Sequence, residues 1–255
     1  MGKRDIECED IRKEIEFFME SVASKKISVD EDDSSPDCYI YNEFSFQHEL
    51  GIYLREKYQG KYIIKFEKKT KANSCKSEID IYITDLKGNG VYAIELKFLK
   101  NSEIPDRMFG CLEDMKFMYD VLTQEEKMKK TFCVVIAKTP CFYEGDIPKT
   151  IRKELIDAYR ELEKKEENEQ LKKFLKNYDN YYNVYYYFRA KEEQKNKKYI
   201  DQRKSLDIVY GQTKGKLRLL DTKACMNTIS KSIPIEWKTL IKGEKPKYYI
   251  IELKK

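Results

Sequence analysis

Two acidic side chains and one basic side chain stand in strand-like stretches where a buried core would favour aliphatic residues. Asp80 lies within SEIDIYITD, residues 77–85, and Glu95 and Lys97 lie within VYAIELKFL, residues 91–99. Carboxylate oxygens are the ligands that hard divalent cations prefer. A neighbouring ammonium can orient or deprotonate a water molecule, or stabilise negative charge on a phosphate. These residue types therefore point to metal-assisted chemistry on a phosphate.

A tight turn is expected to bring these three residues together. Three isoleucines alternate with polar residues along 77–85, which predicts a strand that carries Asp80 on the face opposite to Ile79, Ile81 and Ile83. Gly88-Asn89-Gly90 then predicts a hairpin between this strand and 91–99. For a turn centred near residues 87–89, we expect Asp80 close to Lys97, with Glu95 about one pleat away.

The elements around the hairpin alternate between helical and strand-like periods. Apolar residues recur at helical spacing over 9–24, 45–58 and 104–122, with Ser45 as the expected N-cap of the second helix. Residues 61–69 and 131–140 have the pattern of two further strands. Segment 44–140 thus runs helix, three strands, helix, strand, which predicts an α/β fold. Glu49, in the helix before the strands, adds a third carboxylate.

This motif and this order of elements resemble the PD-(D/E)xK nuclease superfamily. EID at residues 78–80 and ELK at residues 95–97 match its signature, and residues 44–140 match its αβββαβ core. Ile79 stands in place of the proline of the signature, which many members also lack. Glu49 resembles the additional helix-borne acid of archaeal Holliday-junction resolvases and several restriction enzymes.

The resemblance implies a restriction-endonuclease-like fold, with a mixed central sheet flanked by helices. It also implies a metal-dependent endonuclease that hydrolyses DNA phosphodiester bonds, most commonly in restriction or defence. By this resemblance Asp80 and Glu95 would ligate Mg²⁺, for which Mn²⁺ would substitute, and Glu49 would assist. Lys97 would act on the attacking water. Cleavage of both strands of a duplex would fit a homodimer.

The pattern divides the chain into three parts. Residues 1–43 hold an N-terminal helix and an acidic loop, and residues 44–140 hold the nuclease-like core. Residues 141–255 form an α+β elaboration that we expect to pack on the core. It contains a charged helix or helix pair at 148–177, a final strand at the end, and a tyrosine-rich stretch at 178–188. The tyrosines suit a strand packed on the core, a base-stacking platform or an interface.

Basic residues flank the motif in a way that fits a nucleic-acid partner. The formal net charge is +5, which permits an anionic partner without requiring one. Phosphate contacts of this type give affinity and no sequence choice. Simple solubility is the alternative role for the residues predicted to contact DNA, which are Lys65, Lys68, Lys69, Lys71, Lys76, Lys100 and Arg107.

Composition argues against several other classes of protein. The seven cysteines form no CxxC pair, which argues against a zinc site or a disulfide framework. His48 is the single histidine, so His-rich metal sites are excluded. No apolar run approaches the length of a membrane span, and residues 1–10 lack an apolar signal core. We therefore expect a cytoplasmic protein that does not contact membranes.

Two alternatives to a nuclease remain open. One is a catalytically silent nucleic-acid-binding or assembly protein that retains the fold. The other is a structural interaction protein whose interface is the tyrosine-rich segment, with Asp80 and Lys97 forming an ordinary surface salt bridge on a hairpin. A second ExK triplet, Glu252 to Lys254, has the same spacing as the motif but no partner carboxylate on a hairpin-linked strand, and we predict that it is not catalytic.

Overall fold

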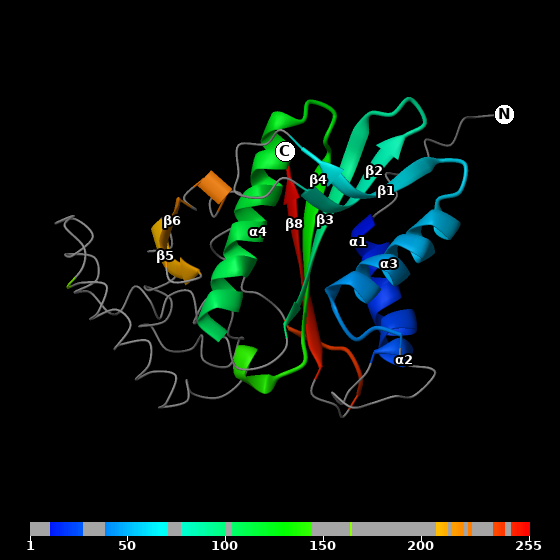
Figure 1. Cartoon of the computed structure of the whole chain (residues 1–255). Coiled ribbons are helices and arrows are strands. Elements are labelled where there is room, and N and C mark those ends of the chain that lie inside the picture. Colours follow the sequence, from blue (N-terminus) through cyan, green and yellow to red (C-terminus); the bar gives the residue numbers. More distant parts are fainter. Residues whose placement is uncertain are drawn as a thin grey trace.

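The computed structural model describes residues 11–27, 39–70, 78–99, 104–143, 164, 208–213, 216–221, 224–225, 237–242 and 246–255. These residues form a mixed α/β structure, which confirms the predicted fold class at that level (Figure 1). No helix within these ranges is long and apolar enough to cross a membrane. The charged segment 148–177, except Lys164, and the tyrosine-rich segment 178–188 lie outside the described residues.

A six-stranded mixed sheet forms the centre of the structure, in the order β1, β2, β3, β4, β8, β7. The bounds of these strands are β1 Tyr62–Lys69, β2 Glu78–Asp85, β3 Gly90–Leu99, β4 Lys130–Ala137, β7 Lys238–Thr239 and β8 Lys247–Lys254. Neighbouring strands pair antiparallel, except that β3 and β4 are parallel. The predicted final strand is therefore an interior strand of the main sheet. A separate antiparallel pair joins β5, Ile208–Thr213, to β6, Lys216–Asp221.

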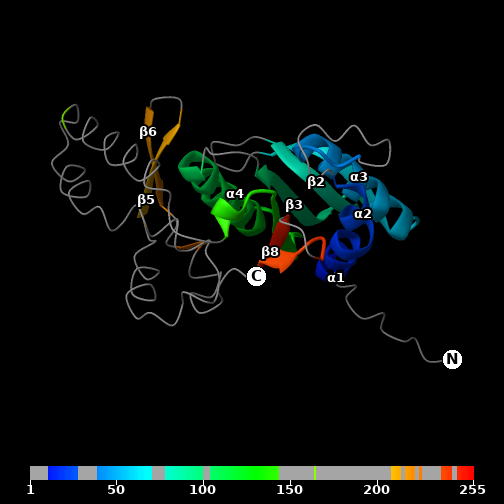
Figure 2. The same ribbon diagram turned by 90° about the horizontal axis from the view of Figure 1, so that it is seen from below.

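Helices cover both faces of the main sheet. Helix α4, Ile104–Gln124, lies along one face, and α1, Ile11–Phe18, and α3, Glu43–Lys57, lie on the other (Figures 1 and 2). The parallel β3–β4 pair requires a crossover connection, and α4 provides it. The order α3, β1, β2, β3, α4, β4 confirms the predicted helix, three strands, helix, strand.

The remaining short helices adjoin these elements. Helix α1 continues through a π-helical stretch, Met19–Ala23, into α2, Ser24–Lys26, so the described part of the helix predicted at 9–24 contains a π-helical interruption. The strand predicted to reach residue 140 ends at Ala137, because Pro140 begins a 3₁₀ turn, Pro140–Phe142. Proline lacks the N–H that a continuing strand would need.

Alternation along β3 divides the buried residues between two cores. One set packs under α1 and α3, and it includes Tyr92, Ile94, Leu96 and Phe98. Ala93 and Leu99 belong to the other core, under α4. Successive side chains of a strand point to opposite faces, so Glu95 and Lys97 face α4. The predicted separation of Glu95 and Lys97 from the face of Tyr92, Ile94 and Leu96 is confirmed.

The start of α3 differs from the prediction by three residues. Asn42 is the N-cap, and its side chain accepts a hydrogen bond from the Ser45 backbone N–H at 2.8 Å. Ser45 is instead the third helical residue, and its hydroxyl accepts the Asn42 backbone N–H at 3.1 Å. This reciprocal capping box starts the helix at Glu43. The earlier start places Glu43 on the helix, where it becomes important for the site.

The β2–β3 hairpin is confirmed, but its register differs from the prediction. Asp85 folds the turn by accepting N–H hydrogen bonds from Lys87 and Asn89, and Gly88 adopts φ +85°. The last pair of the ladder joins Ile81 to Ile94, so Glu95 is the β3 residue in line with Asp80, where Lys97 was expected. The physical reason is that Asp85 closes a turn that covers residues 86–89. The pairing next to this turn is also irregular, with a register shift between Ile83 and Thr84.

Candidate active site

Asp80 lies where strand β2 loses its regular alternation. Ile81 and Ile83 pack in the core under α1 and α3, whereas Ile79 belongs to the core under α4. The pairing with β1 is interrupted at this point, and the opposing Glu67 adopts a left-handed φ of 48°. Positive φ is uncommon for residues other than glycine. The expectation that the three isoleucines share one face is thus wrong for Ile79.

The backbone and side chain of Asp80 are held by two different elements. Its carbonyl accepts a hydrogen bond from the Gln47 side chain of α3 at 2.7 Å. Its carboxylate Oδ2 accepts the backbone N–H of Leu96 on β3, also at 2.7 Å. The recorded β2–β3 pairing ends at Ile81 and Ile94, so this side-chain contact takes over where the backbone ladder stops. Asp80 is therefore fixed against the strand that carries the rest of the motif.

Glu95 is a buried carboxylate beside Asp80. It is 1% exposed and is paired in register with Cys133 on β4. On the other side, it follows Ile94, whose β2 partner Ile81 is the neighbour of Asp80. Burial of a carboxylate is costly unless it is paired or binds a cation. Glu95 thus presents its carboxylate toward the α4 side of the sheet, and Asp80 supplies a second carboxylate from the adjacent strand.

Lys97 is held by two carboxylates that come from different helices. Its Nζ lies 3.1 Å from Oδ2 of Asp114 on α4 and 3.6 Å from Oε2 of Glu43 on α3. The same Glu43 oxygen accepts the backbone N–H of Phe98 at 3.2 Å. The Lys97 side chain is only 15% exposed. The ammonium therefore sits at a fixed position next to the strand residues of the motif.

The electrostatics of this cluster keep Lys97 charged. Burial lowers the pKa of Lys97, but the nearby carboxylates of Asp114 and Glu43 raise it by more, so the net pKa lies above its ordinary value. Lys97 is consequently an ammonium at neutral pH. It can orient a water molecule or stabilise phosphate charge, but it cannot accept a proton from water.

Cys111 borders the same cluster from α4. Its thiol pKa is raised to about 12, chiefly by burial and secondly by the negative charge of Asp114. The thiolate is the nucleophilic form of cysteine. Cys111 is thus a protonated packing residue at neutral pH, and thiol nucleophilic chemistry at this position is excluded.

Three residues of the cluster were not predicted from the sequence: Glu43, Gln47 and Asp114. Asp114 could have been found from the sequence, because it is an acidic residue on the apolar stripe of the helix. In the structure it is 4% exposed. Glu43 was hidden because the helix was expected to begin at Ser45. Gln47 lies one turn after Glu43, on the same side of α3.

Glu49 does not share that side of α3. Each helical residue turns the chain by about 100°, so Glu49 lies about 200° from Gln47. Among the described residues, no group of three or more His, Cys, Asp or Glu side chains is arranged to hold a metal ion. The structure thus ties Asp80 to the strand segment that carries Glu95 and Lys97, while Glu49 lies on another side of α3. The roles of all four residues stay predictions.

The residues present still fit a magnesium ion. Mg²⁺ commonly binds through one or two carboxylates, and water and substrate phosphates complete its shell. Asp80 and Glu95 supply two carboxylates from the adjacent strands β2 and β3. They are hard oxygen donors, as Mg²⁺ and Mn²⁺ require.

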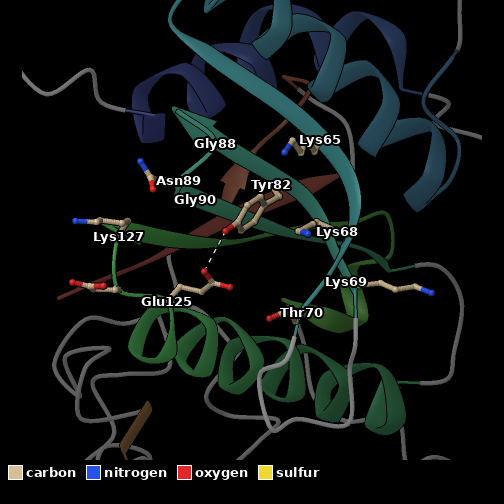
Figure 3. Close-up of a pocket in the computed structure, with 11 residues that line it drawn as sticks. Lys65, Lys68, Lys69, Thr70, Tyr82, Gly88, Asn89, Gly90, Glu125 and Lys127 are labelled. Carbon is tan, nitrogen blue, oxygen red and sulfur yellow. Dashed lines mark hydrogen bonds between the residues drawn. The ribbon is translucent and has the colours of Figure 1, made fainter. Parts of the chain in front are cut away.

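The predicted DNA-contacting residues are only partly described. Lys65, Lys68 and Lys69 are exposed on β1, where they line a pocket on the α4 side of the sheet (Figure 3). Arg107 is exposed on α4. Lys71, Lys76 and Lys100 lie outside the described residues. Their contact with nucleic acid stays a prediction.

The second ExK triplet lies on the other face of the sheet. Glu252 is opposite Phe132, which packs under α1 and α3. Its carboxylate forms an ion pair with Lys130 at 2.9 Å. Glu252 therefore faces away from Glu95, across the thickness of the sheet.

No protein-family model, no curated protein and no solved structure matches this chain. The functional argument consequently rests on the geometry of the cluster itself.

Proposed function

We propose that the protein is a Mg²⁺-dependent endonuclease that hydrolyses phosphodiester bonds in DNA. The observation that carries the proposal is the hydrogen bond that ties the Asp80 carboxylate to Leu96, the residue between Glu95 and Lys97. In the proposal the two carboxylates supply cation ligands, and the largely buried Lys97 ammonium acts beside them. The order of elements and the mixed sheet also support a restriction-endonuclease-like core within residues 44–140.

Each residue has a defined task in this proposal. When bound by Asp80 and Glu95, Mg²⁺ supplies charge neutralisation at the phosphate and lowers the pKa of bound water. Lys97 remains an ammonium, so it orients the attacking water and stabilises the charge that develops on the phosphate oxygens. Asp114 and Glu43 hold the Lys97 side chain in place. Gln47 and the Leu96 amide hold Asp80.

A catalytically silent DNA-binding or assembly protein is the second candidate. The specific observation in its favour is that Lys97 already forms ion pairs with two carboxylates, as a structural lysine does. The presence of Asp80 and Glu95 near Lys97 favours the nuclease, because a packing role alone does not require two carboxylates there.

Cleavage of supercoiled plasmid DNA, with Mg²⁺ or Mn²⁺ and with or without EDTA, tests the proposal. We expect nicked or linear products that require metal and are lost in Asp80→Asn. Glu252→Gln is the matched control, since it alters a carboxylate on the opposite face. DNA binding without cleavage under any metal condition would favour the silent protein.

A further inference from the structure

A pocket of about 520 Å³ lies away from the residues of the candidate active site. Figure 3 shows it between the edge strand β1, the β2–β3 turn and the residues that follow α4. Neither Asp80, Glu95 nor Lys97 lines it. Tyr82, two residues beyond Asp80 in β2, forms part of its wall. The pocket therefore neighbours the candidate site but does not share its side chains.

One side of the pocket is basic. Lys65, Lys68 and Lys69 of β1 form this side. Lys127 lies across the pocket, in the loop after α4 and next in sequence to Glu126 (Figure 3). All four are exposed, and in the described part of the chain none of them forms an ion pair. Four lysines against the two glutamates of the lining leave an excess of positive charge. This excess favours an anion, and phosphate is an anion that lysine ammonium groups bind well.

The opposite side of the pocket carries two glutamates beside Lys127, and one of them, Glu125, is held by a hydrogen bond. The Tyr82 hydroxyl donates a hydrogen bond to Oε2 of Glu125 at 3.4 Å, and Glu126 lies next to it in the lining (Figure 3). The pKa of Tyr82 is raised to about 12, first by burial and then by the charge of Glu125, so the phenol keeps its proton. Glu125 is thus a positioned acceptor for N–H groups of a ligand.

Small residues make this arrangement of Tyr82 possible. A Cβ atom at Gly90 would lie 1.8 Å from the Tyr82 hydroxyl oxygen. The cross-strand partner of Tyr82 on β3 is Ala93, another small residue, whereas its partner on β1 is Lys65. Tyr82 is itself only 5% exposed, so it supports the wall and does not offer a ring face for stacking.

The size and the charges of the pocket together select a class of ligand. Small-molecule pockets commonly measure about 300–1,000 Å³, and a water molecule takes about 30 Å³. Inorganic phosphate alone would leave most of this pocket to solvent. A fitting ligand carries a phosphate at one end and N–H donors at the other. We propose that the pocket binds a nucleoside phosphate, with its phosphate at the β1 lysines and an amino-bearing base edge at Glu125 and Glu126.

Titration calorimetry of the metal-free protein with mononucleotides tests this site independently of any nuclease activity. GMP offers a ring N–H and an amino group to the carboxylates, whereas UMP has no exocyclic amino group. We expect GMP to bind at least about fivefold more tightly than UMP, and both to bind more tightly than inorganic phosphate. Equal affinity for GMP, UMP and phosphate, or no saturable binding of GMP, would overturn the proposal.

Two sets of variants test which residues contact the phosphate and which contact the base of the ligand. Lys68→Glu with Lys69→Glu should weaken GMP binding at least about tenfold. Glu125→Gln with Glu126→Gln should reduce the preference for GMP over UMP to less than about twofold. The control Lys13→Glu with Lys242→Glu makes the same change in net charge at exposed lysines outside the lining. An equal loss in the control would mean general electrostatic attraction and would refute the pocket.

The nucleoside phosphate could be free or could be the end of a nucleic-acid strand, and a second titration distinguishes these sources. A single-stranded oligonucleotide with a 5′-phosphoguanosine is compared with the same strand carrying a 5′-hydroxyl. A preference for the phosphorylated strand that Lys68→Glu with Lys69→Glu removes would support the strand end. Binding of GMP without such a preference would support the free nucleotide.

Discussion

The Asp80 carboxylate accepts a hydrogen bond from the Leu96 backbone amide at 2.7 Å, at the place where the backbone pairing of β2 and β3 has ended. A side chain thus continues the link between the two strands. The residues on either side of Leu96 are Glu95 and Lys97, so this one contact fixes Asp80 relative to both. The geometry of the candidate site therefore depends on the hydrogen bond from the Leu96 backbone to the Asp80 side chain, which stands where a backbone–backbone pair would otherwise be.

Replacing Asp80 by asparagine should remove the negative charge of this residue while keeping its hydrogen bond to the Leu96 N–H. The amide oxygen can still accept the Leu96 N–H, so we expect a cost of only about 1 kcal/mol in unfolding free energy. The loss of a carboxylate should weaken Mn²⁺ binding at least about tenfold in titration calorimetry, because hard cations depend on anionic oxygen ligands. Unchanged affinity in Asp80→Asn, with Glu252→Gln as the control, would remove the metal from this position.

Replacing Lys97 by methionine should leave the Asp114 carboxylate buried without its ammonium partner. Asp114 has a side chain that is 5% exposed, and Lys97 one that is 15% exposed. We expect a loss of about 3 kcal/mol in unfolding free energy, measured by urea denaturation. Adding Asp114→Asn should recover part of it, because a neutral amide costs less to bury than a carboxylate. No recovery in the double variant would contradict a stabilising Lys97–Asp114 pair.

The same Lys97→Met variant should nearly abolish DNA cleavage while DNA affinity falls less than about threefold, since one phosphate contact among many contributes little to affinity. An effect on the Michaelis constant alone would make Lys97 a binding residue.

The contribution of Lys97 to the unfolding free energy should not change between pH 6 and pH 9. The pKa of Lys97 is raised in the folded state, so this contribution is complete below the unfolded-state pKa of about 10.4 and is lost only above it.

Local patterns were sufficient to predict the elements, and they failed where distant elements meet. Alternation and helical spacing gave the hairpin and the helices on either side of it, because both depend on neighbouring residues. The register was wrong because it depends on hydrogen bonds made by the Asp85 side chain within the turn. The contacts of Glu43, Gln47 and Asp114 follow from how α3 and α4 dock on the sheet, and no local period encodes that docking.

The position of β8 shows the same limit. Its strand character was predicted from KYYIIELKK, but its insertion between β4 and β7 joins parts of the chain that are more than one hundred residues apart in sequence. A period-two pattern identifies a strand and the face it buries, but it cannot name the partner strand.

Because of Cys111, the unfolding free energy of the protein should fall at alkaline pH. Its folded pKa is about 12, and an unfolded thiol has a pKa of about 8.5. The unfolded state therefore loses the proton first, and stability falls as the pH rises above 8.5. The difference in unfolding free energy between wild type and Cys111→Ala should shrink by about 2 kcal/mol from pH 8 to pH 10. A constant difference in urea denaturation would mean that the thiol titrates alike in both states.

Gly90 should tolerate no side chain, because the Tyr82 ring occupies the space that a Cβ atom would need. The nearest atoms to that Cβ are the Tyr82 hydroxyl oxygen at 1.8 Å and Cζ at 2.3 Å. Gly90→Ala should cost about 1–3 kcal/mol in unfolding free energy. The matched control is Gly110→Ala in α4, where a Cβ meets no heavy atom within 4 Å and alanine should gain about 0.5–1 kcal/mol. Equal effects of the two substitutions in chemical denaturation would contradict this account of Tyr82.

The second ExK triplet provides the sharpest test of which strand carries the chemistry. Glu252 and Lys254 repeat the spacing of Glu95 and Lys97, but Glu252 faces the α1 and α3 side and pairs with Lys130. The double variant Glu252→Gln, Lys254→Ala should therefore keep full cleavage activity in the plasmid assay. It should cost about 1–3 kcal/mol in unfolding free energy, because the Glu252 side chain is only 15% exposed and its removal leaves Lys130 without this partner. Glu95→Gln, assayed alongside, should be inactive. If the double variant were inactive and Glu95→Gln remained active, the active site would belong on the opposite face of the sheet.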